Sequence, residues 1–233
     1  MQNKHYVVVG GSSGIGLALV RKLAMEGAYV TVLSRTGDEL VGMPTVTHVE
    51  YDALGNEFPD VEIPEAIHGF VYCPGSIVLK PFSSLKPDQY REDFELNVVG
   101  AVKSLKGCLK ALKKAESASV VLFSTIAVGQ GLRFHASVAA AKGAVEGLSR
   151  ALAAELTPKV RVNCIAPALV DTPLAGRILS TPEKKEAQGQ NNPMGRVGEP
   201  EDVAETAFFL LSDKSSWITG QTFGVDGGMS VLR

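Results

Sequence analysis

Short apolar runs alternate along the chain with longer stretches in which apolar residues recur at helical spacing. The short runs are rich in Val, Ile and aromatic residues, which is typical of β-strands. The predicted strands are Tyr6–Gly10, Tyr29–Ser34, Thr45–Glu50, Gly69–Cys73, Ser119–Ser124, Val160–Ile165 and Thr222–Val225. The predicted helices are Ile15–Glu26, Pro87–Lys114, Phe134–Leu156 and Glu201–Leu211. Strands that alternate with helices indicate parallel βαβ units.

The strands are nearly continuous in Val, Leu and Ile, which predicts burial on both faces of a sheet. We therefore expect an α/β, Rossmann-type fold. Its doubly wound parallel sheet of about seven strands should lie in three α/β/α layers, in a single domain over residues 1–233. The Arg35–Thr45 segment is short and Ala53–Pro64 contains Gly and Pro, so the helices between strands two and four should be shortened. The long helix over 87–114 should break near Asn97–Gly100, and residues 171–198 should form a substrate lid.

A glycine-rich turn follows the first predicted strand and opens the first predicted helix. Glycines permit a tight turn and a close backbone approach, and the free N–H groups at a helix start favour a pyrophosphate. The turn therefore predicts a dinucleotide site. The candidate binding residues in it are Gly10, Ser12, Ser13, Gly14, Ile15 and Gly16.

Several motifs in the same order resemble the short-chain dehydrogenase/reductase family. The turn at 10–16 (GGSSGIG) is similar to the family's TGxxxGIG motif, with Gly10 in place of Thr. Leu96–Gly100 resembles its NVxG motif, Ala139–Leu156 its active-site helix, and Arg161–Pro173 its VNxxxPGxVxTP stretch. The resemblance spans almost the whole chain and implies a nicotinamide-dependent oxidoreductase.

The end of the second strand indicates which dinucleotide is preferred. NAD-preferring members carry an acidic residue there, whereas this chain has Ser34 followed by Arg35. The guanidinium of Arg35 can bind the 2′-phosphate on the adenine ribose of NADP(H). We therefore expect NADP(H) to be preferred over NAD(H). The alternative for Arg35 is a solvated surface side chain, and Asp52 is either an adenine contact or a turn-capping residue. The resemblance adds these candidate cofactor contacts: Ala53, Cys73, Pro74, Gly75, Asn97, Lys142, Pro167, Val170 and Thr172.

One member of the family's catalytic set is missing from this chain. The family uses a tyrosine as proton donor and a lysine four residues later on the same helix face. The candidate lysine is Lys142, and the residue four positions before it is Val138, which carries no proton. None of the five tyrosines, at positions 6, 29, 51, 72 and 90, has a lysine four residues on. The tyrosine is therefore absent and not merely shifted in register.

The other catalytic candidates are present. Thr125 lies 13 residues before Val138, where the resemblance places the family's serine, and Ser124 beside it is the fallback. Both could instead cap the end of a strand. Asn97 matches the family asparagine, or is a residue at a helix break that bonds the backbone. His135 is a possible surrogate acid, although a lone histidine is more often exposed or capping.

These residues leave three functions open. The first is an NADP(H)-dependent oxidoreductase with a proton route that does not use tyrosine, acting on a small carbonyl, imine or activated alkene. The second is a catalytically silent NADP(H)-binding protein, either a redox sensor or an inactive partner subunit. The third is a non-redox catalyst that uses the same pocket. Loss of a general acid costs about 10²–10⁴ in rate, which slows such chemistry without abolishing it.

Composition limits the partners. The chain has 233 residues with a net charge of −2 and a pI near 6.1, which gives no electrostatic case for nucleic acid or an anionic membrane. Its three cysteines are widely spaced, so we expect a reduced, cytoplasmic protein with no metal site. The resemblance implies a homotetramer or homodimer that pairs through the two long helices, over 87–114 and 134–157.

Overall fold

The computed structural model describes residues 1–55 and 57–232, and its centre is one seven-stranded sheet. All neighbouring strands are parallel, and the strand order is β3-β2-β1-β4-β5-β6-β7. The strands are β1 (His5–Val9), β2 (Tyr29–Ser34), β3 (Val46–Glu50), β4 (Gly69–Tyr72), β5 (Ala118–Phe123), β6 (Val160–Pro167) and β7 (Thr222–Val225). The expected Rossmann-type α/β fold is confirmed.

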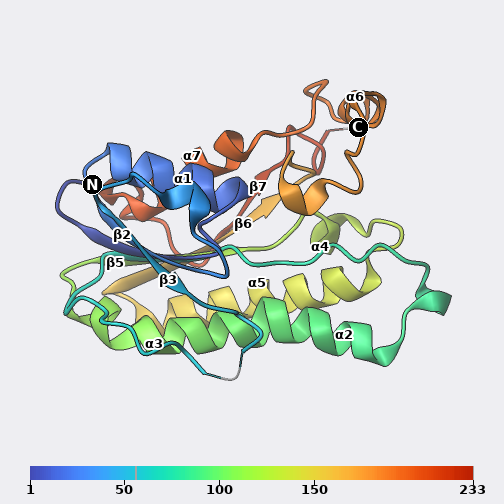
Figure 1. Cartoon of the computed structure of the whole chain (residues 1–233). Helices are drawn as coiled ribbons and strands as arrows, with labels where there is room; N and C mark the ends of the chain where they lie inside the picture. The colour runs from blue at the N-terminus through green and yellow to red at the C-terminus, as the bar shows by residue number, and fades with distance from the viewer. Residues whose placement is uncertain (56, 233) are drawn as a thin grey trace.

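Helices cover both faces of this sheet (Figure 1). One face carries α1 (Gly14–Met25) and α7 (Pro200–Leu211), which pack against each other. The other face carries α3 (Gly100–Lys114) and α5 (Ala136–Leu156), which pack on the central strands. The remaining α-helices are α2 (Pro87–Phe94), α4 (Ala127–Gln130) and α6 (Pro182–Gln190).

Alternation along each strand divides the core between the two faces. Val7 and Val9 of β1 belong to the cluster under α3 and α5, whereas Tyr6 and Val8 belong to the cluster under α1 and α7. All four side chains are almost fully buried. Because both faces bury apolar side chains, the strands lack a polar face, as the sequence pattern indicated.

The predicted boundaries differ from the structure by one or two residues at most element ends, and one difference has a clear physical cause. The second long helix begins at Ala136 and not at Phe134, because Phe134 has a φ of 68°. A non-glycine residue in that left-handed region cannot belong to the first turn of an α-helix. The break expected near Asn97–Gly100 is a five-residue π-helical segment, Glu95–Val99, between α2 and α3.

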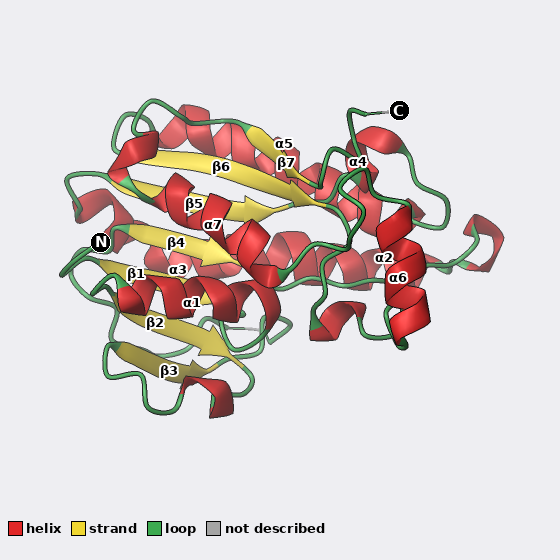
Figure 2. Ribbon diagram, turned by 90° about the horizontal axis from the view of Figure 1, so that it is seen from above, coloured by secondary structure: helices red, strands yellow, loops and turns green. Residues whose placement is uncertain are grey.

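The crossover segments between β2 and β4 are short, as predicted. Only a three-residue 3₁₀ turn, Asp38–Leu40, lies between β2 and β3, and the described residues between β3 and β4 contain no helix. At the opposite edge the chain is longer, and the segment 171–198 contains α6. Figure 2 shows that the strands point toward the end of the molecule where α4 and α6 lie. The carboxyl ends of parallel strands are where a doubly wound fold places its ligand.

Candidate active site

The glycine-rich turn joins β1 to α1 in a conformation that only glycines accept at its key positions. Gly10 has a φ of 74°, and a Cβ atom on Gly16 would lie 2.2 Å from the carbonyl oxygen of Gly10. Any side chain at position 16 would therefore force the turn open. The first turn of α1 holds no acidic residue, so its free N–H groups face no competing negative charge. This geometry fits a pyrophosphate.

An elongated groove of about 710 Å³ runs from this turn along the carboxyl ends of β1, β2 and β4. Its lining includes most of the residues that the sequence analysis proposed for the dinucleotide: Gly10, Ser12, Ser13, Gly14, Ile15, Gly16, Ser34, Arg35, Asp52, Ala53, Cys73, Pro74, Gly75 and Thr172. Pro74 packs close to Gly10, since a Cβ atom on Gly10 would lie 3.0 Å from the Pro74 Cδ. The turn and the segment after β4 therefore form one continuous floor.

The three residues proposed for the adenine end differ in their free hydrogen-bonding capacity. Ser34 is buried, and its hydroxyl donates to the backbone oxygen of Thr36 at 2.8 Å. Arg35 is exposed and takes part in none of the ion pairs found among the described residues. Asp52 accepts from the backbone N–H of Leu54 at 3.0 Å, so it does cap a turn while also lining the groove. Arg35 is thus the residue of the three most available to a phosphate.

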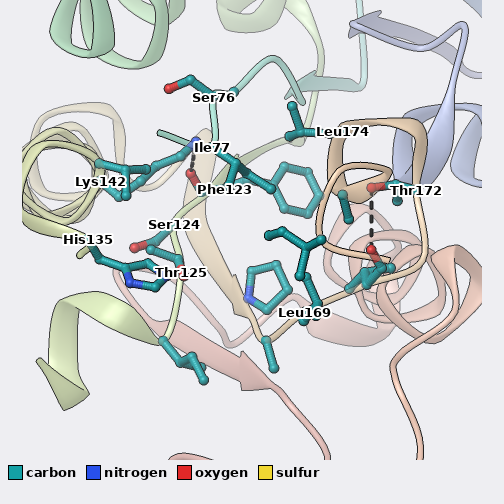
Figure 3. A pocket seen from close by; sticks show the side chains of 18 of the residues that line it. Ser76, Ile77, Phe123, Ser124, Thr125, His135, Lys142, Leu169, Thr172 and Leu174 are labelled. Atoms are coloured by element: carbon teal, nitrogen blue, oxygen red, sulfur yellow. Dashed lines mark hydrogen bonds between the residues drawn. The ribbon is translucent and has the colours of Figure 1, made fainter. Parts of the chain in front are cut away.

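A second cavity of about 340 Å³ adjoins the groove, and most of its surface is apolar. The two share Ile15, Cys73, Gly75, Thr172 and Leu174, so a ligand can pass from one to the other. Further apolar side chains complete the cavity, namely Ile77, Leu79, Phe123, Ile126, Leu132, Val138, Leu169, Val170, Ala175, Ile178 and Met229. Its polar groups include Ser76, Ser124, Thr125, His135, Lys142 and Gln188. Figure 3 shows Lys142, Ser124 and Thr125 on one side of this cavity and Leu174 and Thr172 on the other.

Lys142 carries the only side-chain ammonium that lines either cavity among the described residues. It belongs to α5, is 7% exposed, and donates from Nζ to the backbone oxygen of Phe123 at 2.9 Å. Burial lowers the pKa of Lys142 to about 8, although Cys164, Cys73 and Asp93 oppose that shift. An ammonium with a pKa in this range can hold or release a proton near neutral pH.

Val138 lies one helical turn before Lys142 on the same face of α5. Its side chain is 6% exposed and lines the cavity. His135 precedes α5 and also lines the cavity, while its Nδ1 lies 2.6 Å from the backbone oxygen of Arg133. Only the other ring nitrogen of His135 is therefore available to a ligand.

The two candidate hydroxyls at the end of β5 are held differently. Thr125 accepts the backbone N–H of Ala127 on its Oγ1 at 3.3 Å, within the turn that leads into the short α4. Ser124 donates its hydroxyl to Glu146 Oε1 at 2.7 Å. Both line the cavity. Thr125 accepts a hydrogen bond and keeps its own proton free, whereas Ser124 donates its proton to Glu146. Thr125 is therefore the better donor toward a substrate oxygen.

Asn97 does not reach either cavity. It is 1% exposed in the π-helical segment, and its Nδ2 donates to the backbone oxygen of Asp93 at 2.7 Å and to Ser76 Oγ at 3.2 Å. Its Oδ1 is buried and has no hydrogen-bond partner. The backbone-bonding role that the sequence left open for Asn97 is therefore observed. Pro167 and Val170, proposed as cofactor contacts, line the apolar cavity and not the groove.

Part of the segment 171–198, which the sequence analysis predicted to be a substrate lid, borders the apolar cavity. Leu174, Ile178 and Gln188 line the cavity from this segment, whereas Leu179 does not. A parallel bridge between Val170 and Gly198 brings the two ends of this segment together.

The sequence analysis missed three polar residues here, Ser76, Asp93 and Glu146. Each had a weak signal in its spacing, because Glu146 follows Lys142 by one helical turn, Asp93 precedes Asn97 by one turn, and Ser76 follows the glycine that ends the groove. Spacing alone does not distinguish such residues from solvated surface groups.

Comparisons with known proteins agree with this architecture. A family model described as enoyl-(acyl carrier protein) reductase matches residues 9–230. The chain is 32% identical to L-xylulose reductase from Bos taurus over 98% of this chain and 97% of that protein. It is 30% identical to a 3-oxoacyl-(acyl-carrier-protein) reductase from Chlamydia trachomatis over 98% of both. A short-chain type dehydrogenase/reductase from Mycobacterium ulcerans superposes with a TM-score of 0.87 at 30% identity, covering 100% of this chain and 92% of that one.

The chain therefore belongs to the short-chain dehydrogenase/reductase family of oxidoreductases, whose members bind nicotinamide cofactors. Thermoplasma acidophilum aldohexose dehydrogenase is a further structural relative, with a TM-score of 0.88 at 27% identity over 100% of this chain and 96% of that one. Across the described residues, the helices are all too short or too polar to cross a bilayer.

Proposed function

We propose that this protein is an NADP(H)-dependent oxidoreductase that moves a hydride to or from a small, uncharged, largely apolar carbonyl, imine or activated alkene. The observation that carries the proposal is the junction of the two cavities. The groove that fits a dinucleotide opens directly onto the apolar cavity, and Cys73 and Gly75 line both. Thr125 and Lys142 line the cavity, and Lys142 Nζ lies next to Gly75 at that junction. A nicotinamide held in the groove would supply the hydride there.

The substrate class follows from the lining of the cavity. Lys142 is the only lysine, arginine or carboxylate side chain that lines it within the described chain, and this side chain already donates to the backbone. A phosphate, carboxylate or polyol substrate would meet leucine and isoleucine side chains in place of partners for its polar groups. Burial of apolar surface is instead favourable by about 25 cal/mol per Å². An apolar ketone or cyclic enone therefore suits the cavity better than a sugar.

The preference for NADP(H) is supported by Arg35. Its side chain is exposed, lines the groove beside Ser34 and carries no counter-ion among the described residues. A guanidinium in this place can form two parallel hydrogen bonds with a 2′-phosphate. No carboxylate precedes it at the end of β2, so this strand itself places no negative charge against that phosphate.

The residues of this chain have separate parts in the reaction. We assign Thr125 to polarising the substrate oxygen, because its proton is free, and Lys142 to binding the ribose hydroxyls and holding a proton. Val138 excludes water from the face where the family has its tyrosine. The lid at 171–198 closes over the substrate.

The decisive experiment restores the missing hydroxyl. Oxidation of NADPH is followed by absorbance with cyclohexanone, acetophenone, a cyclic imine and cyclohexenone. In Val138→Tyr we expect kcat/KM for the ketones to rise about 100-fold, the lower end of what a general acid contributes. Val138→Phe is the matched control, with the same ring and no proton, and it should give no such rise. Equal behaviour of the two variants, with NADPH still bound, contradicts the placement of Val138 at the reaction centre.

A second candidate function is a catalytically silent NADP(H) sensor or partner subunit. The specific observation in its favour is that the residue facing the cavity at position 138 is apolar and nearly buried. A wild-type protein that binds NADPH in calorimetry and consumes none with any substrate of the panel would favour this function. A non-redox catalyst remains a third alternative, which the same panel addresses through substrate conversion without NADPH consumption.

We also propose that the chain acts as a single-domain subunit of a cytoplasmic homo-oligomer. The three cysteines are free thiols, of which two are buried, as suits a reducing compartment. The helices α3 and α5 are the proposed contact surface between subunits. Light scattering tests this, and a monomer at micromolar concentration would contradict it.

A further inference from the structure

A second polar cluster lies beside the junction of the two cavities, outside the expected catalytic set. Ser76 follows Gly75 and lines the apolar cavity. Its hydroxyl donates to Asp93 Oδ1 in a short hydrogen bond and accepts from Asn97 Nδ2 at 3.2 Å. Asn97 Nδ2 also donates to the backbone oxygen of Asp93 at 2.7 Å, which fixes the position of all three groups. A serine of the cavity wall is thus connected through its hydroxyl to a carboxyl group behind it.

Asp93 is an unusual residue for the interior of a protein. It is 2% exposed, its Oδ2 is buried without a hydrogen-bond partner, and no ion pair among the described residues includes it. Burying a carboxylate without full compensation costs several kcal/mol. Because of this cost, an aspartate at this position does not stabilise the fold. A residue that takes up and releases a proton can still be favoured here, because no fixed cation holds its carboxyl group in the charged form.

The neighbouring serine–carboxylate pair is arranged differently. Ser124 donates to Glu146 Oε1 at 2.7 Å, but Glu146 is 16% exposed and its other oxygen lies 3.8 Å from the guanidinium of Arg150. That carboxylate is therefore close to a cation and partly exposed to water. Of the two pairs, only Ser76–Asp93 combines a hydroxyl at the cavity with an uncompensated buried carboxyl group.

We propose that Ser76 and Asp93 form the proton relay of this active site and serve in place of the missing tyrosine, an inference that rests on the proposed oxidoreductase function. In alcohol oxidation, Ser76 Oγ takes the alcohol proton while its own proton passes to Asp93 Oδ1. A nicotinamide bound in the groove in its oxidised form would accept the hydride from the alcohol carbon, so that a carbonyl would form. Reduction is the reverse, in which protonated Asp93 returns its proton to Ser76 as Ser76 protonates the substrate oxygen.

The ionisable groups around Asp93 set how the relay responds to pH. Lys142, on the packed helix α5, is the facing cation, and the negative charge of Asp93 raises the pKa of Lys142 against the larger effect of burial. A Cβ atom on Gly75 would lie 3.4 Å from Lys142 Nζ and 3.5 Å from Asn97 Oδ1, so these groups are close neighbours. The thiols of Cys73 and Cys164 have their pKa raised to about 12 by burial and stay neutral. Among these neighbours, Lys142 is therefore the group whose pKa lies nearest neutral pH.

The test compares Asp93→Asn and Ser76→Ala with the wild type in oxidation of the alcohol made from the best ketone of the panel. In both variants kcat should fall about 100-fold with KM within about three-fold, the pattern of a lost proton-transfer group. The dependence of kcat on pH should also differ between Asp93→Asn and the wild type, because an amide cannot exchange the proton that the relay carries. The double variant should be no slower than either single variant, since both changes break one path.

Two controls separate this effect from damage to the fold. Asp88→Asn makes the same chemical change on the same helix at an exposed position, and Ser149→Ala removes a buried hydroxyl remote from both cavities. Both should retain wild-type kcat, and all four variants should bind NADP⁺ in calorimetry as the wild type does. Should Asp93→Asn fail to fold, Ser76→Ala by itself decides the result.

The possible failures are distinguishable. If the wild type binds the dinucleotide but turns over no alcohol or carbonyl, the proposed function fails and the relay fails with it. If the wild type turns over and both relay variants match Asp88→Asn in kcat and pH profile, the relay alone is overturned.

Discussion

The dinucleotide groove and the apolar cavity adjoin, yet they are built on different principles. The groove is formed largely by backbone, with glycines at the turn between β1 and α1, and it lies open to water near Arg35. The cavity is formed by side chains from many separate segments, and its single ammonium is nearly buried. The first site therefore tolerates no added side chain, whereas the second tolerates changes of shape but not changes of charge.

The largest effect is expected at the turn. In Gly16→Val, the Cβ atom would lie 2.2 Å from the Gly10 oxygen, so the turn must open. Its N–H groups would then no longer point toward the pyrophosphate. We expect affinity for NADPH to fall at least about 1,000-fold, which is about 4 kcal/mol in calorimetry. Gly129→Ala is the control, because a Cβ atom there meets nothing within 4 Å. Intact binding in Gly16→Val would contradict the assignment of the turn.

The second prediction concerns the charge in the cavity. Burial lowers the pKa of Lys142 from 10.5 to about 8, so the folded protein releases this proton at lower pH than the unfolded chain does. The ammonium therefore destabilises the fold by about 3 kcal/mol below pH 8, and this cost disappears between pH 8 and 10.5. Lys142→Met should be more stable than the wild type at pH 7 by roughly that amount, with the difference vanishing near pH 10.5.

This difference must be measured between the two proteins at each pH by denaturant unfolding. Desolvation raises the pKa of Cys73, Cys108 and Cys164 to about 12, so these thiols lower the stability of both proteins above pH 9. That common loss cancels in the comparison. A difference that does not change with pH would contradict the buried ammonium.

The third prediction returns to the open end of the groove. Arg35→Ala should weaken NADPH binding about 10- to 100-fold, the value of a charge-assisted pair of hydrogen bonds. Affinity for NADH should stay within about two-fold, which makes the second coenzyme an internal control. Equal losses for both coenzymes would indicate that Arg35 contacts some other part of the dinucleotide.

The smallest effect is expected at the lid. Ile178→Asn places an amide against the apolar cavity and should raise KM for ketones about ten-fold, because a polar group is left without partners. NADPH affinity should not change, since Ile178 lies outside the groove. Val41→Asn, on the exposed surface, is the matched control and should behave as the wild type. A rise in the Kd for NADPH in Ile178→Asn would contradict the claim that Ile178 contacts the substrate and not the dinucleotide.

The groove could be predicted in most of its residues, and the cavity could not. A turn between a strand and a helix is a local feature, so the spacing of Gly10, Gly14 and Gly16 was sufficient to indicate it. The shortened crossovers and the break before α3 were visible for the same reason. Leu132, Leu169 and Met229 line the cavity together although they are far apart in the chain, and no pattern along the chain links them.

The sequence by itself determined the order of strands and helices, the glycine turn and the valine one turn before Lys142. These depend on periodicity and on residue types close together in the chain. Only the tertiary structure decided that Asp93 is buried behind Ser76, that Ser124 is held by Glu146, and that Asn97 faces neither cavity. Burial, hydrogen-bond partners and proton affinity depend on how α2, α5 and the segment after β4 pack together, and that packing joins residues that the chain keeps apart.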